Sequence, residues 1–426
     1  MYYKEIKKAK PVAQTDLQKL QETVSSILQS VRKGGDRYLD DYYTKKLGGR
    51  KPKPFLVSPK EVAKAKDQLP PQLVDTLDFA IERITAFAQA QRDSLKEFEK
   101  EMLPGMIMGQ RIIPVASCGC YIPGGNYPNL ATGLMTVIPA KVAGVQRIVC
   151  CSPREGDKGI HPGILYPLFK LGIDEIYSFG GANAIGVLAF GTESIRPVDL
   201  VVGPGNQYVT EAKRQVYGIV GIDFLAGPSE ILIIADKTAR ADFLAADLIA
   251  QCEHDQNARG ALVVTSEALA HETLKEIDRQ LKNRSTQEIA RTSWENKGIV
   301  VVVENLRDAA RYADEYAPEH LEIHTSDPKS FLPLLHNYGS VFLGVNAAEV
   351  YADKVIGLNH VLPTGATARY TGGLWVGMYL KTVTHMMFDV KASLLAARHT
   401  DILTSAEGMD GHRYSAVIRL ENLKPQ

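Results

Sequence analysis

The sequence predicts an α/β fold with two Rossmann-like domains built on parallel sheets, an N-terminal helical region and a short C-terminal tail. From Gln110 onward, short runs rich in β-branched residues alternate with helical stretches rich in alanine and leucine. This alternation is typical of parallel βαβ units. The runs form two series that are separated near Gly221 to Ser229, so we expect two sheets with their junction in this segment.

The predicted strands are residues 147–151, 175–179 and 199–202 in one series, and 230–234, 261–264, 298–303 and 321–324 in the other. Residues 1–120 and 230–370 are expected to form the first Rossmann-like domain, which includes the N-terminal helices. Residues 121–229 are expected to form the second, nucleotide-binding domain. Residues 371–426 form a helical tail that is too short to fold alone, so we expect it to pack on another domain or subunit.

The N-terminal quarter is predicted to be helical. Residues 14–48 and 59–101 are rich in Leu, Ala, Lys, Glu and Gln at helical spacing. Pro70 and Pro71 mark a break between two helices.

The composition indicates a globular protein whose partners are small molecules and other protein chains. Its 49 basic and 49 acidic residues cancel, and no long run of either charge suggests a nucleic-acid or membrane surface. The N-terminus lacks the apolar core of a signal peptide, and no apolar run approaches the roughly 18 residues of a membrane-spanning helix. We therefore expect a cytoplasmic protein, and we interpret its five cysteines as buried thiols.

A predicted helix at residues 242–254 ends in a polar pair. Leu244, Leu248 and Gln251 share one face at helical spacing, and His254 lies three residues after Gln251. A polar pair on the face that the leucines bury needs partners. A bound metal would provide them, and so would hydrogen bonds in a core without a metal. The helix alone leaves both interpretations open.

Metal ligands and proton carriers recur in four short clusters of the second half. The clusters are Gln251 with His254, Glu319 with His320, Asp353 with Asn359 and His360, and Glu407 with His412. Imidazole, carboxylate and amide oxygen are ligands of zinc, and a small set of them leaves a coordination position open for a substrate. The remaining histidines have no such neighbours and are interpreted as structural: His161, His271, His324, His336, His385 and His399.

Three strand-to-helix junctions carry glycine and amide side chains, at residues 121–125, 180–183 and 203–206. Glycine lets the backbone approach a ligand closely, and the following helix offers free N–H groups to a phosphate. A nucleotide therefore fits these turns. None of them has the G-x-G-x-x-G pattern of dinucleotide-binding proteins, so tight turns without a ligand explain them equally well.

Eight motifs, in order along almost the whole chain, resemble the histidinol dehydrogenase family. They are YIPGG, PAKVAGV, GPGN, EAKR, AGPSE, QCEH, YAPEHL and NHVLPT. The resemblance implies a homodimer with a dimerising tail and one zinc ion per site. It also implies an enzyme that uses two NAD in turn to oxidise a primary alcohol to an aldehyde and then to a carboxylate.

The resemblance also implies roles for individual residues. The zinc ligands would be Gln251, His254, Asp353 and His412, and His412 would come from the tail of the partner subunit. The proton carriers would be Glu319 and His320. The nucleotide contacts would be Tyr121, Asn183 and Asn206, and the substrate contacts would be Ser229, His360 and Glu407. In this chemistry His320, near its unperturbed pKa of about 6.5, accepts the proton of a zinc-held alcohol as hydride leaves. Glu319 then acts as the general base for the water that attacks the aldehyde.

The sequence departs from the family where the substrate is expected. Ala131 stands where the family usually has a serine that faces the substrate, Tyr127 adds bulk, and Trp375 lies in a segment that differs from the usual one. Such changes predict a different alcohol, best matched by a small anionic diol such as the 2,3-dihydroxypropanesulfonate of sulfopropanediol dehydrogenases. L-histidinol is the alternative substrate. Two other classes stay open: a zinc hydrolase with Glu319 as base, and a metal-binding protein without catalytic activity.

Overall fold

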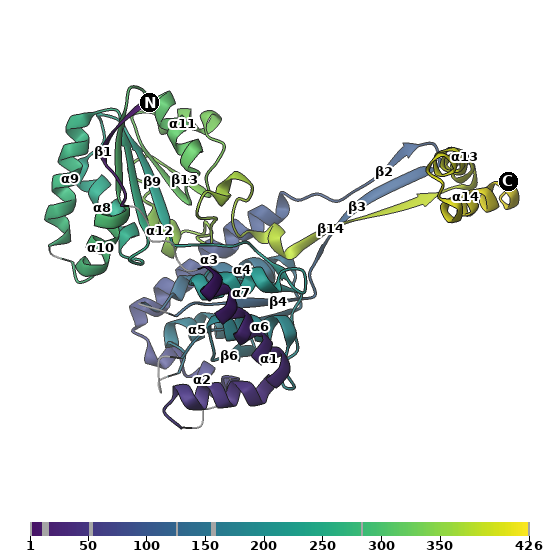
Figure 1. Ribbon diagram of the computed structural model, residues 1–426, viewed down its shortest axis with the longest axis horizontal. Coiled ribbons are helices and arrows are strands. Elements are labelled where there is room, and N and C mark those ends of the chain that lie inside the picture. The colour runs from purple at the N-terminus through teal and green to yellow at the C-terminus, as the bar shows by residue number, and fades with distance from the viewer. Residues whose placement is uncertain are drawn as a thin grey trace. The chain divides into compact units, whose positions relative to one another are not determined.

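The structure is a computed structural model that describes residues 2–10, 17–50, 54–124, 127–154, 159–282 and 284–424. It contains two compact units (Figure 1). Unit 1 comprises Met1–Ala90 and Val115–Tyr379, and unit 2 comprises Gln91–Pro114 and Leu380–Gln426. Unit 1 contains both of the parallel sheets, so the division of the chain into two separate Rossmann-like domains stays a prediction.

A six-stranded sheet occupies the second half of unit 1, with the order β1-β11-β10-β9-β12-β13. Its parallel strands are β9 (Glu230–Ala235), β10 (Arg259–Val264), β11 (Ile299–Val303), β12 (His320–His324) and β13 (Ser340–Leu343), and β1 (Tyr3–Lys7) pairs with β11 antiparallel. Helices α8 (Ala241–Cys252), α9 (Glu267–Leu281) and α10 (Gln287–Lys297) cover one face, and α11 (Leu306–Tyr316) covers the other. The short helix α12 (Glu349–Lys354) follows β13.

A five-stranded sheet forms the rest of the framework of unit 1, with the order β6-β5-β4-β7-β8, and all of its pairs are parallel. The strands are β4 (Ser117–Tyr121), β5 (Arg147–Cys151), β6 (Glu175–Tyr177), β7 (Leu200–Val202) and β8 (Gly221–Ile222). The helices that connect them are α4 (Leu130–Ala143), α5 (Pro162–Lys170), α6 (Gly181–Phe190) and α7 (Gln207–Val216).

Both sheets have the same winding. If the parallel strands of each sheet are numbered along the chain, both run in the order 3-2-1-4-5. This is the order of doubly wound α/β folds, in which the winding reverses between strands 1 and 4. The prediction of an α/β fold with parallel sheets is confirmed, and all seven predicted strands are present.

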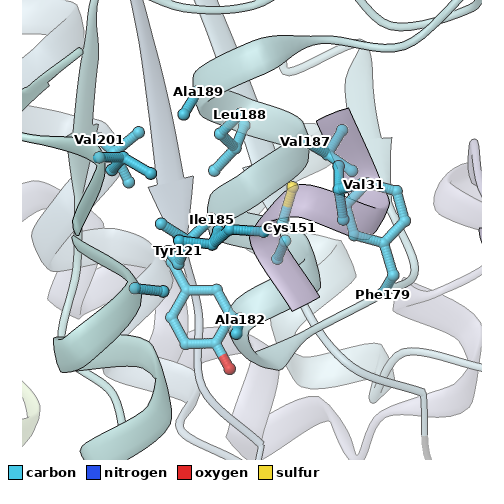
Figure 2. Close-up of a cluster of buried hydrophobic side chains, with 14 of the residues drawn as sticks. Val31, Tyr121, Cys151, Phe179, Ala182, Ile185, Val187, Leu188, Ala189 and Val201 are labelled. Carbon is cyan, nitrogen blue, oxygen red and sulfur yellow. The ribbon is translucent and has the colours of Figure 1, made fainter. Parts of the chain in front are cut away.

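The N-terminal helices require a correction. Helix α1 (Leu17–Lys46) contacts α6 and α7 beside the five-stranded sheet, not the helices of residues 230–370. Gly186 of α6 explains the close packing, because a Cβ atom there would lie 3.2 Å from Leu28 and 3.3 Å from Val31. Figure 2 shows Val31 in the apolar cluster that includes Phe179. Residues 14–16 of the predicted helix lie outside the described residues.

Two predicted boundaries are also wrong. The helical stretch predicted to reach residue 101 consists of α2 (Pro59–Ala63) and α3 (Pro71–Asp93), and it is followed by a strand, β2 (Phe98–Leu103). The domain boundary expected between residues 120 and 121 falls inside β4, which pairs with β5 up to Tyr121.

Unit 2 is an antiparallel sheet with two helices. Strand β3 (Met106–Pro114) lies between β2 and β14 (Leu380–Phe388), and α13 (Val390–Glu407) packs against α14 (Asp410–Asn422) (Figure 1). The sequence did not predict this sheet, because every residue of β2 is exposed and the strand therefore lacks an apolar alternation. The predicted C-terminal tail thus forms its compact unit together with residues 91–114.

All five cysteines are buried thiols, as predicted. Within the ranges that the structure describes, no helix is long and apolar enough to cross a bilayer.

Gly203, in the turn after β7, provides a test of the close packing at the carboxyl end of the five-stranded sheet. Its φ is +116°, and a Cβ atom there would lie 2.2 Å from the carbonyl oxygen of Tyr121. We expect Gly203→Ala to lose about 1–2 kcal/mol of stability from backbone strain and about 1–3 kcal/mol more from the overlap. Gly218→Ala is the control, since Gly218 has a φ of +97° and no neighbour within 4 Å. Equal midpoints of urea unfolding for the two variants would contradict this account.

Candidate active site

The predicted metal and proton-transfer residues of unit 1 stand on three neighbouring elements. Gln251 lies in the last turn of α8, Glu319 and His320 lie at the start of β12, and Asp353 lies in α12. The side chain of Gln251 is fully buried, and its Oε1 lies 3.0 Å from Nδ1 of His320. The structure therefore joins the predicted metal helix to the predicted proton carriers.

Asp353 is the centre of the polar contacts in this region. Its Oδ1 lies 2.9 Å from Nδ1 of His360, and its Oδ2 lies 3.9 Å from Nε2 of His254. Lys354 forms an ion pair with the same carboxylate. Burial raises the pKa of Asp353, but His360 and Lys354 outweigh it and hold this pKa well below its usual range. Asp353 is therefore a carboxylate anion at neutral pH.

Glu319 is buried beside His320. Its Oε2 accepts a hydrogen bond of 2.9 Å from the N–H of Glu230 and lies 3.8 Å from Nδ1 of His320. Burial raises the pKa of this carboxyl well above its usual value, and the nearby charge of Glu230 adds to the shift. A raised pKa makes the carboxylate a stronger base once its proton has left.

The pKa of His320 differs from the expected value near 6.5, and that expectation is wrong. Burial lowers the pKa of His320 to about 3, because the imidazolium loses the solvation that water would give it. The ring is therefore neutral at pH 7, which is the form that can accept a proton. The lowered pKa also makes the ring a weaker base, and the sequence gives no measure of the burial that lowers it.

The donor set of unit 1 fits a zinc ion. Amide oxygen, imidazole and carboxylate are all zinc ligands, and they come here from Gln251, His254 and Asp353. Burial lowers the pKa of His254, which keeps its ring in the neutral form that binds metals. Nε2 of Gln251 is buried and has no hydrogen-bond partner; because an amide nitrogen does not bind zinc, the amide would have to exchange its two ends for its oxygen to face the ion.

The fourth predicted ligand belongs to the other compact unit. His412 lies in α14 and Glu407 at the end of α13, both in unit 2, and both side chains are exposed. The structure thus brings three of the four predicted ligands into unit 1, and it groups His412 with the predicted substrate contact Glu407.

One predicted substrate contact, His360, touches Asp353, and α4 packs beside it. Ala131 is buried in the first turn of α4, and the next residue, Thr132, places its Oγ1 3.0 Å from Nε2 of His360. Tyr127 donates a hydrogen bond of 3.3 Å to the carbonyl oxygen of Glu253. Its bulk therefore lies beside the candidate metal residues, where the sequence departs from the family.

Ser229 is half-buried and directly precedes β9, and its carbonyl oxygen accepts a hydrogen bond of 3.0 Å from the N–H of Arg259. Trp375 is 36% exposed.

The predicted nucleotide contacts follow strands of the five-stranded sheet. Tyr121 ends β4, and its hydroxyl accepts a hydrogen bond of 3.1 Å from the N–H of Gly181. Asn183 is buried in α6, and its Oδ1 has no hydrogen-bond partner. Asn206 follows β7 and caps α7, where its Oδ1 accepts from the N–H groups of Tyr208 and Val209.

Two of these turns, which follow β4 and β7, lie where doubly wound sheets bind ligands, and the third follows the edge strand β6. Strands β4 and β7 are adjacent, and the winding of the sheet reverses between them. Ligands of such folds bind outside the carboxyl ends of the strands at this reversal. The unpartnered oxygen of Asn183 favours a ligand, whereas Asn206 already has a structural role as a helix cap. Gly125 and Asn126, in the first predicted turn, lie outside the described residues.

The sequence missed several residues that belong to this region. Glu349, in α12, places Oε1 3.5 Å from Nε2 of His320. His324, which was interpreted as having no metal-ligating neighbour, lies with Glu322 and Asp247 in a buried cluster. The sequence carries a signal for this cluster: His320, Glu322 and His324 alternate along one strand, and alternate residues share one face of a sheet.

Fold and site together define a doubly wound α/β protein in which residue types that can bind a metal lie beside a buried carboxyl group and a buried imidazole. A family model described as histidinol dehydrogenase matches residues 10–420. The chain therefore belongs to the histidinol dehydrogenase family, whose members are dehydrogenases, and the resemblance of its motifs is confirmed.

Individual relatives agree with this assignment. A histidinol dehydrogenase of Bacillus cereus is 43% identical over 94% of this chain and 93% of its own length. A sulfopropanediol 3-dehydrogenase of Ruegeria pomeroyi is 38% identical over 99% of this chain and 97% of its own length. The crystal structure of histidinol dehydrogenase from Elizabethkingia anophelis has a TM-score of 0.91 at 32% identity, and the match covers 97% of this chain and 94% of that chain.

The raised pKa of Glu319 predicts how Glu319→Gln changes stability with pH. The folded wild type holds a proton that the unfolded chain releases above about pH 4.5, so wild-type stability falls as pH rises toward the folded pKa. Glutamine can still accept the N–H of Glu230 and has no proton to release. Above about pH 5, we expect the free energy of unfolding of the variant to rise relative to that of wild type by up to about 1.4 kcal/mol per pH unit.

The measurement is urea unfolding between pH 5 and pH 8. Glu82→Gln is the control, since the side chain of Glu82 is 70% exposed. Parallel stability curves for wild type and Glu319→Gln would show that burial does not hold the proton on Glu319.

Proposed function

We propose that this chain is a zinc- and NAD-dependent alcohol dehydrogenase that oxidises a polar primary alcohol through an aldehyde to a carboxylate, with two NAD used in turn. The observation that carries the proposal is the placement of Gln251, His254 and Asp353 beside the buried pair Glu319 and His320. Membership of a family of dehydrogenases supports the reaction type.

Zinc would be held by Gln251, His254 and Asp353, with His412 as the fourth ligand, and when bound it would acidify the hydroxyl of the substrate. His320 is neutral at pH 7 and accepts the proton of that hydroxyl at an imidazole nitrogen. Because its pKa is raised, Glu319 holds a proton in the folded protein; once this proton has left, the carboxylate takes a proton from the water that adds to the aldehyde. Both proton carriers are buried, so bulk water has little access to them.

NAD would bind at the carboxyl edge of the five-stranded sheet. The free Oδ1 of Asn183 offers an acceptor there, and the hydroxyl of Tyr121 is positioned by its hydrogen bond to Gly181.

We propose a small anionic diol, such as 2,3-dihydroxypropanesulfonate, as the substrate. Ala131 lacks the hydroxyl that the family usually presents, and Tyr127 fills space beside His254, so the wall of the site is less suited to an imidazole. The similarity to a sulfopropanediol 3-dehydrogenase over 99% of the chain supports this choice. L-histidinol is the second candidate, because the relative from Bacillus cereus that is 43% identical is a histidinol dehydrogenase.

The anionic group of the proposed diol would need a basic side chain as its partner. Arg369 donates a hydrogen bond to the carbonyl oxygen of Glu315 and lines a surface cavity of about 620 Å³ with Arg307 and Arg311. It is therefore engaged away from the candidate zinc ligands. Lys354, which is 58% exposed and bound to Asp353, is the cation nearest to the proposed chemistry.

The proposed active enzyme is a homodimer with shared sites. Unit 2 carries apolar side chains that are more than 60% exposed, among them Met386, Met387, Ile402 and Leu403. Exposed apolar side chains that gather in this way mark interaction surfaces. A second copy that covers them would also bring His412 and Glu407 to a site that lacks them.

A screen of NAD reduction tests the reaction and the substrate together. The zinc-loaded protein is mixed with NAD and either 2,3-dihydroxypropanesulfonate or L-histidinol, and the absorbance of NADH is followed. We expect kcat/KM at or above about 10⁴ M⁻¹s⁻¹ for the diol and at least about 10-fold less for L-histidinol. The reverse ranking would favour histidinol dehydrogenase proper. A zinc hydrolase would reduce no NAD with either alcohol.

Removal of one proposed ligand tests the metal site. We expect His254→Ala to lose its bound zinc and to lower activity by more than about 100-fold, since removal of a direct ligand exceeds the usual effect of outer-shell residues. Zinc content is measured after gel filtration, and circular dichroism checks the fold. The control is His271→Ala, whose imidazole is 55% exposed on α9. Full zinc content in His254→Ala would mean that His254 is not a zinc ligand.

Mixed dimers test the shared site. A chain with His254→Ala and a chain with His412→Ala should each be inactive as homodimers. In their heterodimer one site receives intact His254 from one chain and intact His412 from the other, so we expect roughly half of the wild-type activity per dimer, given that ligands act as a set. Purified heterodimers without activity would mean that each chain completes its own site.

A further inference from the structure

Three buried side chains that the proposed reaction does not use meet between α8 and β12. They are Asp247, Glu322 and His324, and one ligand atom from each lies within 4.8 Å of the others. Nε2 of His324 lies 3.2 Å from Oε2 of Glu322 and 3.9 Å from Oδ2 of Asp247. Two ligands of one tetrahedral ion at about 2.1 Å are roughly 3.4 Å apart, so these separations suit a single metal.

The two carboxyl groups of this cluster face one imidazole and no lysine or arginine among the described residues. The exposed fractions of the side chains are 14% for Asp247, 0% for Glu322 and 3% for His324. Among the residues that the structure describes, no lysine or arginine forms an ion pair with Asp247 or Glu322. Buried carboxylates are ordinarily paired with a cation, bound to a metal or protonated. Burial and the charge of Glu322 raise the pKa of Asp247 to about 7, as this lack of a cation requires.

A fourth carboxyl group lies beside the cluster. Glu349 is only 3% exposed, and its Oε1 has no hydrogen-bond partner but lies 3.5 Å from Nε2 of His320. Its backbone N–H donates a hydrogen bond of 2.7 Å to Oε1 of Glu322, which places the residue next to the cluster. The charges of Asp353, Glu322 and Asp247 add to burial in raising the pKa of Glu349.

The position of the cluster in the sheet also favours a ligand. His324 is the last residue of β12, and β12 lies beside β9, where the winding of the six-stranded sheet reverses. Carboxyl ends at such a reversal are the usual ligand sites of open α/β sheets. The proposed zinc ligands and proton carriers, by contrast, lie toward the start of β12.

We propose that Asp247, Glu322 and His324 bind a second divalent transition-metal ion, distinct from the proposed zinc. Two carboxylates and an imidazole suit ions such as Zn²⁺, Mn²⁺ or Co²⁺. The role of the ion is structural, because each element that it joins carries an active-site residue. Asp247 stands one helical turn before Gln251, Glu322 stands two residues after His320, and Glu349 stands one turn before Asp353.

The test measures metal binding by the full chain and does not depend on NAD or on the substrate. Protein stripped by a chelator is titrated with Co²⁺, and binding is followed by visible absorption and by metal analysis after gel filtration. Wild type is expected to bind two ions per chain. Asp247→Asn and His324→Gln are each expected to lose the ion of this cluster and to keep the other. His254→Ala is expected to lose the proposed zinc and to keep the ion of this cluster.

The matched control is Asp242→Asn, which removes a carboxylate paired with Arg240 at the start of the same helix and should keep both ions. Circular dichroism of each metal-free variant checks folding, and the near-isosteric Asp247→Asn carries the test if His324→Gln does not fold. As a second readout, Co²⁺ should raise the thermal midpoint of His254→Ala but not that of the double variant with Asp247→Asn.

Two outcomes separate this site from the proposed zinc site. If Asp247→Asn and His324→Gln bind as many ions as wild type, protons alone neutralise the cluster and the inference is overturned. If His254→Ala keeps both ions while Asp247→Asn loses one, the cluster is a metal site and the zinc ligands of the proposed function are wrong.

Discussion

The contact between Gln251 and His320 is the constraint on which the rest of the candidate site depends. It joins the last turn of α8 to the first residue of β12, two elements that are 69 residues apart in the sequence. Because both side chains are buried, neither can turn to water if the contact breaks. The hydrogen bond therefore fixes the orientation of the imidazole that the proposed reaction uses as a base, and it holds the amide at the proposed metal.

Around this contact, burial determines the protonation of the polar groups more than ion pairing does. His320 is kept neutral and Glu319 is made a stronger base, chiefly because water is absent. Asp353 is the exception, since His360 and Lys354 keep it charged. Two environments within one site thus give carboxyl groups opposite protonation behaviour, which is the usual way in which an enzyme assigns acid and base roles.

Much of the fold was predictable from the sequence, because buried parallel strands such as residues 230–234 are continuous apolar runs closed by turns. The antiparallel sheet of unit 2 was not, since β2 is exposed and gives no apolar pattern. Likewise, motifs identified Gln251 and His254, but pKa values depend on burial that no motif records. Glu322 and His324 gave no motif, because a strand brings together every second residue and their partner Asp247 is distant in the sequence.

The alternation along β12 has a consequence for how this strand can change in evolution. His320, Glu322 and His324 face α8, and Leu321 and Ile323 face the opposite, apolar cluster, in register with β9. A deletion or insertion of one residue would exchange the two faces, burying three polar groups among aliphatic side chains and turning two aliphatic ones toward Gln251. A substitution in this strand changes one side chain on one face, whereas a change of its length exchanges both faces at once.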